Sequence, residues 1–299
     1  MIKIANAPCS WGALEFYLDK KPLGFQQVLD EMVESGYEGT ELGDWGFMPT
    51  DPADLKNVLH EKKLNLLGAF IPIGLADAGT HSEGIIRALK TAELMHKAGF
   101  KEAFIVLADN NGTDPIRTKN AGRISFSMGL SDEQWITYAA GAEQVARAIK
   151  DMFHMRTVFH HHCAGFVETP SEIDKLMSLT DPSLLGLCLD TGHYAFGGGN
   201  PVNALKKYGK RIWHVHFKDY DPEIGRKSAE NNWDYFQSVA HGVFCELGKG
   251  EVNFKEIVNI LETTGYNNWI VVEQDVLPGM GEPKRSAISN RKYIKSIGL

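Results

Sequence analysis

The sequence predicts an α/β protein built as a single (β/α)8 barrel, and three observations lead to this fold class. Eight short apolar runs alternate with eight longer amphipathic segments along the 299 residues. Such strict alternation requires a parallel sheet, because parallel strands need long crossover connections. No GxGxxG motif follows the first run, as an open dinucleotide-binding sheet would need. Since no linker, repeat or low-complexity tract divides the chain, we expect one domain over residues 1–299.

The predicted strands are apolar runs bounded by turn residues or helix-start signals. In chain order they are residues 2–7, 38–42, 64–71, 103–107, 156–160, 185–189, 211–217 and 269–273. The predicted helices lie between and after them, at 24–35, 52–63, 82–98, 131–152, 170–178, 200–208, 254–264 and 284–297. Several begin at recognisable start signals, namely TDP at 50–52, SDE at 131–133 and TP at 169–170.

Two connections are much longer than the others and cover residues 108–130 and 218–252. Each follows a predicted strand, so in a barrel both lie on the face formed by the carboxyl ends of the strands. Active sites of (β/α)8 enzymes form on that face. We therefore expect these two loops to shape the substrate site.

Composition excludes several other classes of protein. The chain has 31 Lys and Arg against 38 Asp and Glu, a formal charge of −7, which disfavours a nucleic-acid partner. No apolar stretch approaches the length of a membrane span, and the N-terminus lacks the apolar core of a signal peptide. Four scattered cysteines without a CxxC pair are typical of reduced cytosolic thiols. We expect a cytoplasmic enzyme.

Polar side chains collect at the ends of the last four predicted strands, in VFHHHCAG, LCLDTGH, IWHVHFKD and WIVVEQD. Any one of them has an ordinary structural explanation, such as a turn residue or a hydrogen-bonded core histidine. Parallel strands, however, bring these ends together. Because side chains alternate along a strand, His160 and His162 share one face of their strand, and His214, His216 and Lys218 share one face of theirs. His161 is expected to point to the opposite face, toward the surrounding helices. Imidazoles and carboxylates together predict one divalent metal, Mn, Co, Zn or Fe.

These strand ends carry a family resemblance that covers essentially the whole chain. The series resembles the xylose-isomerase-like barrel superfamily of sugar isomerases, epimerases and dehydratases. More narrowly, NAPCSWG at 6–12, ELGDWGFMPTDPADL at 41–55, LDTGHYAFGGGNP at 189–201, VHFKD at 215–219 and VVEQD at 271–275 resemble the inosose dehydratase branch of inositol catabolism. The resemblance implies a metal-dependent enzyme with a small polyol or keto-sugar substrate.

Carried over by position, the resemblance implies Asp190, His216 and Glu273 as metal ligands. The superfamily's first ligand is a Glu, and His160 stands at its position here. Either an imidazole replaces the carboxylate, or three protein groups and solvent hold the metal; we favour His160 as a ligand. Glu168, the next carboxylate, is expected to cap the helix at 170–178.

The replacement bears on mechanism, because epimerases of the superfamily use two Glu ligands as a paired acid and base. The resemblance therefore implies dehydration of scyllo-inosose (2-keto-myo-inositol), with proton abstraction next to the ketone and loss of water. Glu273 is the expected base, and His193 or His162 would orient or protonate substrate oxygens. Lys218 would stabilise the oxyanion, or alternatively form a structural pair with Asp219 or another carboxylate.

Glu41, Trp11 and Trp45 follow the first two strands and are candidate substrate contacts, because a Trp suits the C–H face of a cyclic polyol. A strand-end ion pair and simple packing are the alternatives.

Other functions are weighed against dehydration. An isomerase or epimerase of a ketose or keto-polyol is the main alternative. A barrel endonuclease would need three metals and a basic face, and a non-catalytic sugar-binding barrel would bind without turnover. Barrels of this kind often pair, so a homo-oligomer is compatible with the sequence.

Overall fold

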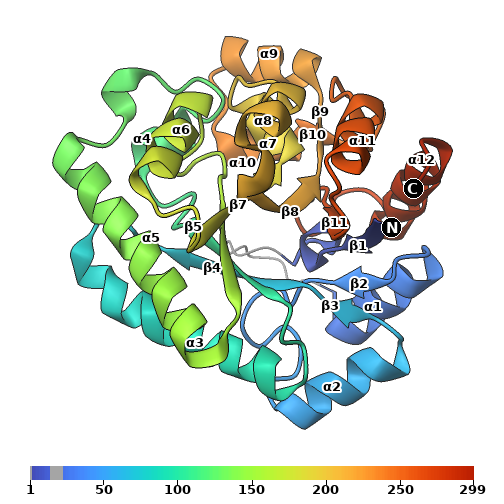
Figure 1. Ribbon diagram of the computed structural model, residues 1–299. Coiled ribbons are helices and arrows are strands. Elements are labelled where there is room, and N and C mark those ends of the chain that lie inside the picture. The colour runs from blue at the N-terminus through green and yellow to red at the C-terminus, as the bar shows by residue number, and fades with distance from the viewer. Residues whose placement is uncertain (1, 14–22) are drawn as a thin grey trace.

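The centre of the molecule is a barrel of parallel strands, seen in Figure 1 with helices packed around it. The structure is a computed structural model that describes residues 2–13 and 23–299. In sheet order the strands are β3 (Asn65–Leu66), β2 (Gly39–Thr40), β1 (Lys3–Asn6), β11 (Trp269–Val272), β8 (Ile212–Phe217), β7 (Leu185–Asp190), β6 (Arg156–His160), β5 (Phe104–Asp109) and β4 (Gly68–Ile73). They confirm the eight predicted runs, because β3 and β4 both belong to the run at 64–71.

Leu67 closes the barrel between β3 and β4. Its N–H donates to the carbonyl of Thr40 in β2 (3.0 Å), and its own carbonyl accepts from the N–H of Phe104 in β5 (2.8 Å). One residue thus joins the two strands that a flat sheet would leave as open edges. The nine short strands therefore form one closed eight-stranded barrel.

Helices cover the outside of the barrel and match the eight predicted segments. They are α1 (Phe25–Glu34), α2 (Pro52–Glu61), α3 (His81–Lys97), α5 (Asp132–Phe153), α6 (Pro170–Leu179), α8 (Pro201–Tyr208), α11 (Phe254–Thr263) and α12 (Pro283–Ser296). The side chains of Asp51, Ser131 and Thr169 cap α2, α5 and α6, as their start signals predict. Among the described helices, none is long and apolar enough to cross a membrane.

The two long connections contain short elements that the sequence did not reveal. Residues 108–130 hold α4 (Pro115–Lys119), and residues 218–252 hold β9 (Asp219–Tyr220), α9 (Pro222–Glu230), α10 (Tyr235–Ala240) and β10 (Phe244–Cys245). A further short helix, α7 (Thr191–Phe196), follows β7 directly. The two insertions pack together, and the Arg123 guanidinium donates to the carbonyl of Trp233 (2.9 Å).

A buried ion pair anchors the first insertion to the barrel. Arg117 is fully buried, and its guanidinium donates to both carboxylate oxygens of Glu172 (2.7 and 2.9 Å). Its Nε donates to the carbonyl of Gly165 (2.7 Å). Glu172 lies in the first turn of α6, so the pair fixes the insertion against the loop that follows β6.

Candidate metal centre and active site

The ends of β6, β7, β8 and β11 bring four ligand side chains together. His160 and Asp190 end β6 and β7, His216 lies near the end of β8, and Glu273 directly follows β11. His160 Nε2 lies 3.5 Å from Asp190 Oδ2, and His216 Nδ1 lies 3.9 Å from the same oxygen and 3.3 Å from Glu273 Oε2. All four side chains are buried. The structure thus groups the four residues that the sequence suggested as metal ligands.

The donor atoms of this cluster fit a divalent cation. Within the described chain, both ring nitrogens of His160 and Nδ1 of His216 are buried without a hydrogen bond, and Oδ2 of Asp190 forms an ion pair with Lys218 Nζ (3.2 Å). Each such nitrogen costs about 1–3 kcal/mol if it stays unsatisfied. One atom from each of these residues and from Glu273 lies within 4.8 Å of the others. Two imidazoles and two carboxylates suit Mn, Fe, Co or Zn.

Glu41 orients the His216 ring through a contact with its Nε2, on the side of the ring away from the cluster. Its Oε1 lies 3.0 Å from His216 Nε2 and 2.7 Å from His214 Nε2. Burial opposes ionisation of Glu41, but the charge of His216 and the hydrogen bonds from both rings lower its pKa to about 2. With Nε2 donating to the Glu41 carboxylate, Nδ1 of His216 faces the cluster, where a bound cation would take the place of its proton. This carboxylate–histidine arrangement is typical of metal-ligating histidines.

Lys218 places a buried ammonium group among three carboxylates. Its Nζ lies 3.2 Å from Asp190 Oδ2, 3.1 Å from Glu273 Oε2 and 2.9 Å from Asp275 Oδ1. Burial alone would lower the pKa of Lys218, but these carboxylates raise it well above its usual value. The alternative pairing of Lys218 with Asp219 is not formed, because Asp219 accepts backbone N–H groups, including that of Gly248 (2.8 Å).

His162 and His193 lie beside Lys218 but differ in their access to the cavity. His162 lines it, and its Nδ1 donates to the carbonyl of Cys163 (2.6 Å). His193 is fully buried behind it, with Nε2 3.0 Å from Lys218 Nζ and 3.5 Å from Asp275 Oδ2. Burial lowers the pKa of both histidines, that of His162 to about 3, so both rings are neutral.

Sequence reasoning missed two residues of the site. Asp275 lies two positions after Glu273 in VVEQD, and the alternation of side chains was a signal that could have identified it. Tyr235 comes from α10 in the second insertion, and its hydroxyl donates to Asp275 Oδ2 (3.2 Å). No sequence pattern marks that tyrosine.

The two tryptophans lie away from the cavity. Trp11 is buried in the main core, and its Nε1 donates to Glu31 in α1 (2.7 Å). Trp45 is 44% exposed, with Lys90 Nζ 4.1 Å from its ring centroid. Among the described residues that line the cavity, the aromatic ring comes from Phe70. Trp11 is thus a packing residue in this structure.

The sequence predicts that Glu168 caps α6, but this prediction is wrong, because Thr169 caps the helix instead. Its carboxylate instead accepts from the N–H of Gly122 (2.7 Å) and of Ala164 (2.8 Å). Glu168 therefore ties the first insertion to the loop after β6.

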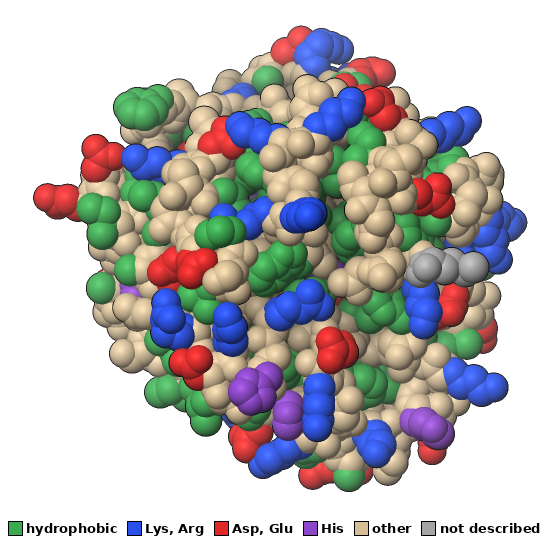
Figure 2. Space-filling view, in the orientation of Figure 1, with side chains coloured by type: hydrophobic (Ala, Val, Ile, Leu, Met, Phe, Trp, Pro, Cys, Tyr) green, Lys and Arg blue, Asp and Glu red, His purple; other side chains and the backbone are tan. Residues whose placement is uncertain are grey.

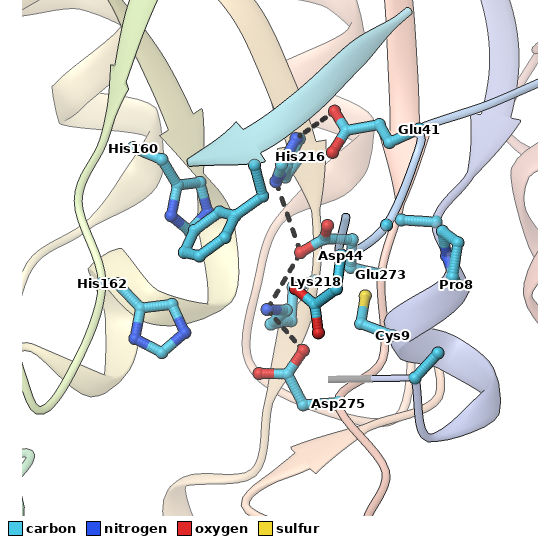
Figure 3. A pocket seen from close by; sticks show the side chains of 14 residues that line it. Pro8, Cys9, Glu41, Asp44, His160, His162, His216, Lys218, Glu273 and Asp275 are labelled. Atoms are coloured by element: carbon cyan, nitrogen blue, oxygen red, sulfur yellow. Dashed lines mark hydrogen bonds and ion pairs between the residues drawn. The ribbon is translucent and has the colours of Figure 1, made fainter. Parts of the chain in front are cut away.

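The cavity over the cluster carries an excess of negative charge. Figure 3 shows His160 and His162 on one side, and Glu41, Glu273, Asp275 and Cys9 on the other. Asp44 also lines it, and Lys218 is the cation among the described lining residues. On the outer surface, Figure 2 shows basic and acidic side chains interspersed over the face in view. On the face in view the charges are mixed, whereas the cavity holds several carboxylates close together.

Comparison with known proteins agrees with this fold. The family model described as "Xylose isomerase-like TIM barrel" matches residues 29–297. The inosose dehydratase of Clostridium botulinum (strain Eklund 17B / Type B) is 32% identical over 294 residues, covering 98% of this chain and 96% of its own. That of Geobacillus kaustophilus (strain HTA426) is 32% identical over 302 residues, covering 99% and 94%.

Solved structures share the fold at low sequence identity. The IolI protein with a bound zinc atom has a TM-score of 0.69 at 15% identity, covering 99% of this chain and 98% of its own. The probable 3-DHS dehydratase AsbF of Bacillus anthracis has a TM-score of 0.68 at 17% identity, covering 99% of both chains. The chain therefore belongs to the xylose isomerase-like TIM barrel family and, within it, to the inosose dehydratase branch of hydro-lyases.

Proposed function

We propose that the protein is a metal-dependent dehydratase that converts scyllo-inosose into a cyclic diketone and water. The proposed ligands of one divalent ion are His160, Asp190, His216 and Glu273. When bound, such an ion supplies Lewis-acid polarisation of the ketone and its neighbouring hydroxyl. The near full-length similarity to proteins named inosose dehydratase supports the substrate.

The observation that carries the proposal is the set of buried ring nitrogens without hydrogen bonds on His160 and His216, which lie next to the carboxylates of Asp190 and Glu273. A protein interior rarely leaves several such atoms facing one point. The pair of imidazoles also makes the cluster asymmetric, which suits an elimination better than an epimerisation. In an epimerisation, two equivalent groups act on opposite faces of one carbon.

Charge in the cavity supports an uncharged substrate. Glu41, Asp44, Glu273 and Asp275 line it against one lysine in the described chain. Even with one bound divalent ion, the four carboxylates and the lysine leave a net charge of −1, so a phosphate or carboxylate on the substrate would meet negative charge in a low-dielectric site. A polyhydroxy ketone instead offers hydroxyl donors to the carboxylates.

The side chains take distinct roles in the proposed reaction. Glu273 is the base that removes the proton from the carbon next to the ketone. Lys218, held by Asp275 at 2.9 Å, stabilises the oxygen on which negative charge develops. His162 points Nε2 toward the cavity, since its Nδ1 is bonded to a carbonyl, and accepts a hydrogen bond from a substrate hydroxyl. The proton that Glu273 removes passes to the hydroxyl that leaves, which departs as water. His193 supports Lys218 from behind, at 3.0 Å.

The deciding assay incubates protein reconstituted with Mn²⁺ or Co²⁺ with scyllo-inosose and follows the conjugated enolic product by ultraviolet absorbance. We expect turnover that disappears after chelation and returns with metal. Full turnover after exhaustive chelation would contradict the metal mechanism.

A second arm addresses the isomerase or epimerase alternative. Solvent deuterium that enters a ketose without loss of water would favour that activity. Metal binding without turnover of either substrate class would favour a sugar-binding barrel.

A further inference from the structure

We propose that Lys218 keeps this centre mononuclear, because its ammonium group fills a second cation site formed by His162, His193 and Asp275. The inference rests on the metal centre of the proposed function. It assigns Lys218 a role that differs from stabilising an oxyanion: it sets the number of metal ions.

The three residues form a donor set of their own. One ligand atom from each lies within 4.8 Å of the others, and all three side chains are buried. Two imidazoles and a carboxylate suit the same divalent ions as the first cluster. A cation already lies at this set, because Lys218 Nζ is 2.9 Å from Asp275 Oδ1 and 3.0 Å from His193 Nε2.

The outer contacts of His162 and Asp275 resemble those of metal ligands. His162 Nδ1 donates to the Cys163 carbonyl at 2.6 Å, which directs Nε2 into the site. Asp275 Oδ2 accepts from the hydroxyl of Tyr235 at 3.2 Å. Such second contacts fix the orientation of metal-binding side chains.

The ammonium group lies between the two donor sets. Besides Asp275, Nζ contacts Asp190 Oδ2 (3.2 Å) and Glu273 Oε2 (3.1 Å), which are oxygens of the first cluster. Figure 3 shows Lys218 between Glu273 and Asp275. In two-metal centres, carboxylates clamp ions about 3.5–4 Å apart. Lys218 thus occupies the position from which a second ion would share carboxylates with the first.

The surrounding fold is shaped to hold this lysine. Thr191 Oγ1 donates to the Lys218 carbonyl (2.7 Å) and accepts from its N–H (2.9 Å). A Cβ on Gly192 would lie 2.5 Å from Lys218 Cγ, so the glycine makes room for the aliphatic stem. The Phe244 ring lies 5.1 Å from Nζ. A buried ammonium costs several kcal/mol unless it is paired, and here three carboxylates compensate it.

The consequence concerns charge and coordination. A lysine supplies one positive charge and cannot bind a substrate oxygen as a ligand. A second divalent metal ion would supply two positive charges and could bind such an oxygen. Removing it leaves three carboxylates facing each other, and the most direct compensation is a second divalent ion.

The test counts bound metal. Wild-type protein and Lys218→Met are stripped by chelation, loaded with excess Mn²⁺, desalted and analysed by elemental mass spectrometry. We expect one equivalent in the wild type and two in Lys218→Met. Electron paramagnetic resonance adds a second readout, because two neighbouring Mn²⁺ ions give an exchange-coupled spectrum and a single ion does not.

Three variants serve as controls. The double variant Lys218→Met/Asp275→Asn removes a ligand of the second site and is expected to return to one equivalent. Lys249→Met, at an exposed lysine, keeps one equivalent. Lys218→Gln, polar and uncharged, repeats the test if the methionine variant does not fold.

The outcomes separate the two proposals. A folded Lys218 variant that binds one equivalent, or a wild type that binds two, overturns the mononuclear role alone. A wild type that binds no metal overturns the proposed function and this inference with it.

Discussion

Glu41 Oε1 lies 3.0 Å from Nε2 of His216, although the two residues are 175 positions apart in the chain. This contact turns Nδ1 of the imidazole toward the cluster of candidate metal ligands. It connects the end of β2 with the end of β8 across the interior of the barrel. The affinity of the metal centre is therefore expected to depend on a residue that is not itself a ligand.

Substituting Glu41→Gln is expected to weaken metal binding by about 10–100-fold, because the variant loses the charge that orients His216. Competition titration with a coloured chelator measures the dissociation constant. Glu38→Gln makes the same chemical change at an exposed position and serves as the control. An unchanged affinity in Glu41→Gln would show that Glu41 does not position the ligand.

Metal removal is expected to lower the thermal stability of the protein. At a free metal concentration 100-fold above the dissociation constant, binding adds about 2.7 kcal/mol to the unfolding free energy. For a chain of this size that corresponds to a shift in Tm of about 4 °C. Thermal unfolding with and without chelator measures it.

Asp190→Asn is the informative variant for this shift. The side chain also caps α7 by accepting from the His193 N–H (2.8 Å), and Asn caps as well as Asp. The variant should fold, and its Tm should not respond to metal. A full metal-dependent shift in Asp190→Asn would rule out Asp190 as a ligand.

Breaking the buried Arg117–Glu172 pair is expected to destabilise the protein strongly. Arg117→Met leaves a buried carboxylate without its partner, at a cost of about 3–5 kcal/mol. Urea unfolding measures the loss. Arg226→Met removes an exposed i,i+4 pair with Glu230 and should change stability by less than about 1 kcal/mol. Equal effects of the two substitutions would contradict the anchoring role of Arg117.

The stability of the protein is expected to depend on pH through Glu168. Burial, only partly offset by Arg117 and two backbone N–H groups, raises its pKa from 4.5 to about 7. The folded state then binds this proton more tightly than the unfolded state. Stability from this group is full below pH 4.5 and is lost as the pH rises to about 7.

The comparison with Glu168→Gln isolates this contribution from that of other groups. The unfolding free energy of the wild type relative to the variant should fall by about 3 kcal/mol between pH 4.5 and 7.5. Urea unfolding across that range provides the measurement, with Glu133→Gln, exposed on α5, as the control. A difference that does not change with pH would contradict the raised pKa.

The barrel could be predicted because its signals are local and repeated. Most of the strands contain a run of apolar residues, and the helices α2, α5 and α6 start at residues whose side chains cap them. The short helices α4, α9 and α10 also begin at capping residues, Asp114, Asp221 and Asp234, but they lack the long amphipathic pattern from which the other helices were predicted. Helices of this length are stabilised mainly by tertiary packing, so their sequences need no long periodic pattern.

The candidate site was predictable in part, for a related reason. Asp275 shares a face with Glu273 and was within reach of the same argument. The position of Trp11 in the core could not be predicted in this way, because the direction of its indole depends on the 3-10 helix Pro8–Trp11 and on Glu31 in α1. A residue next to a strand end can face the cavity or the core, and proximity in sequence does not decide between them.

The sequence by itself determined the barrel and the four side chains that meet at its carboxyl end, because alternating strands and helices send all parallel strand ends to one face. Only the tertiary structure decided which atoms point where. The contact of Glu41 with His216, and the enclosure of Lys218 by Asp190, Glu273 and Asp275, depend on side-chain rotamers packed between distant segments. Periodicity carries no information about such rotamers. The contacts that set the charges and pKa values of the centre therefore form only in the folded barrel.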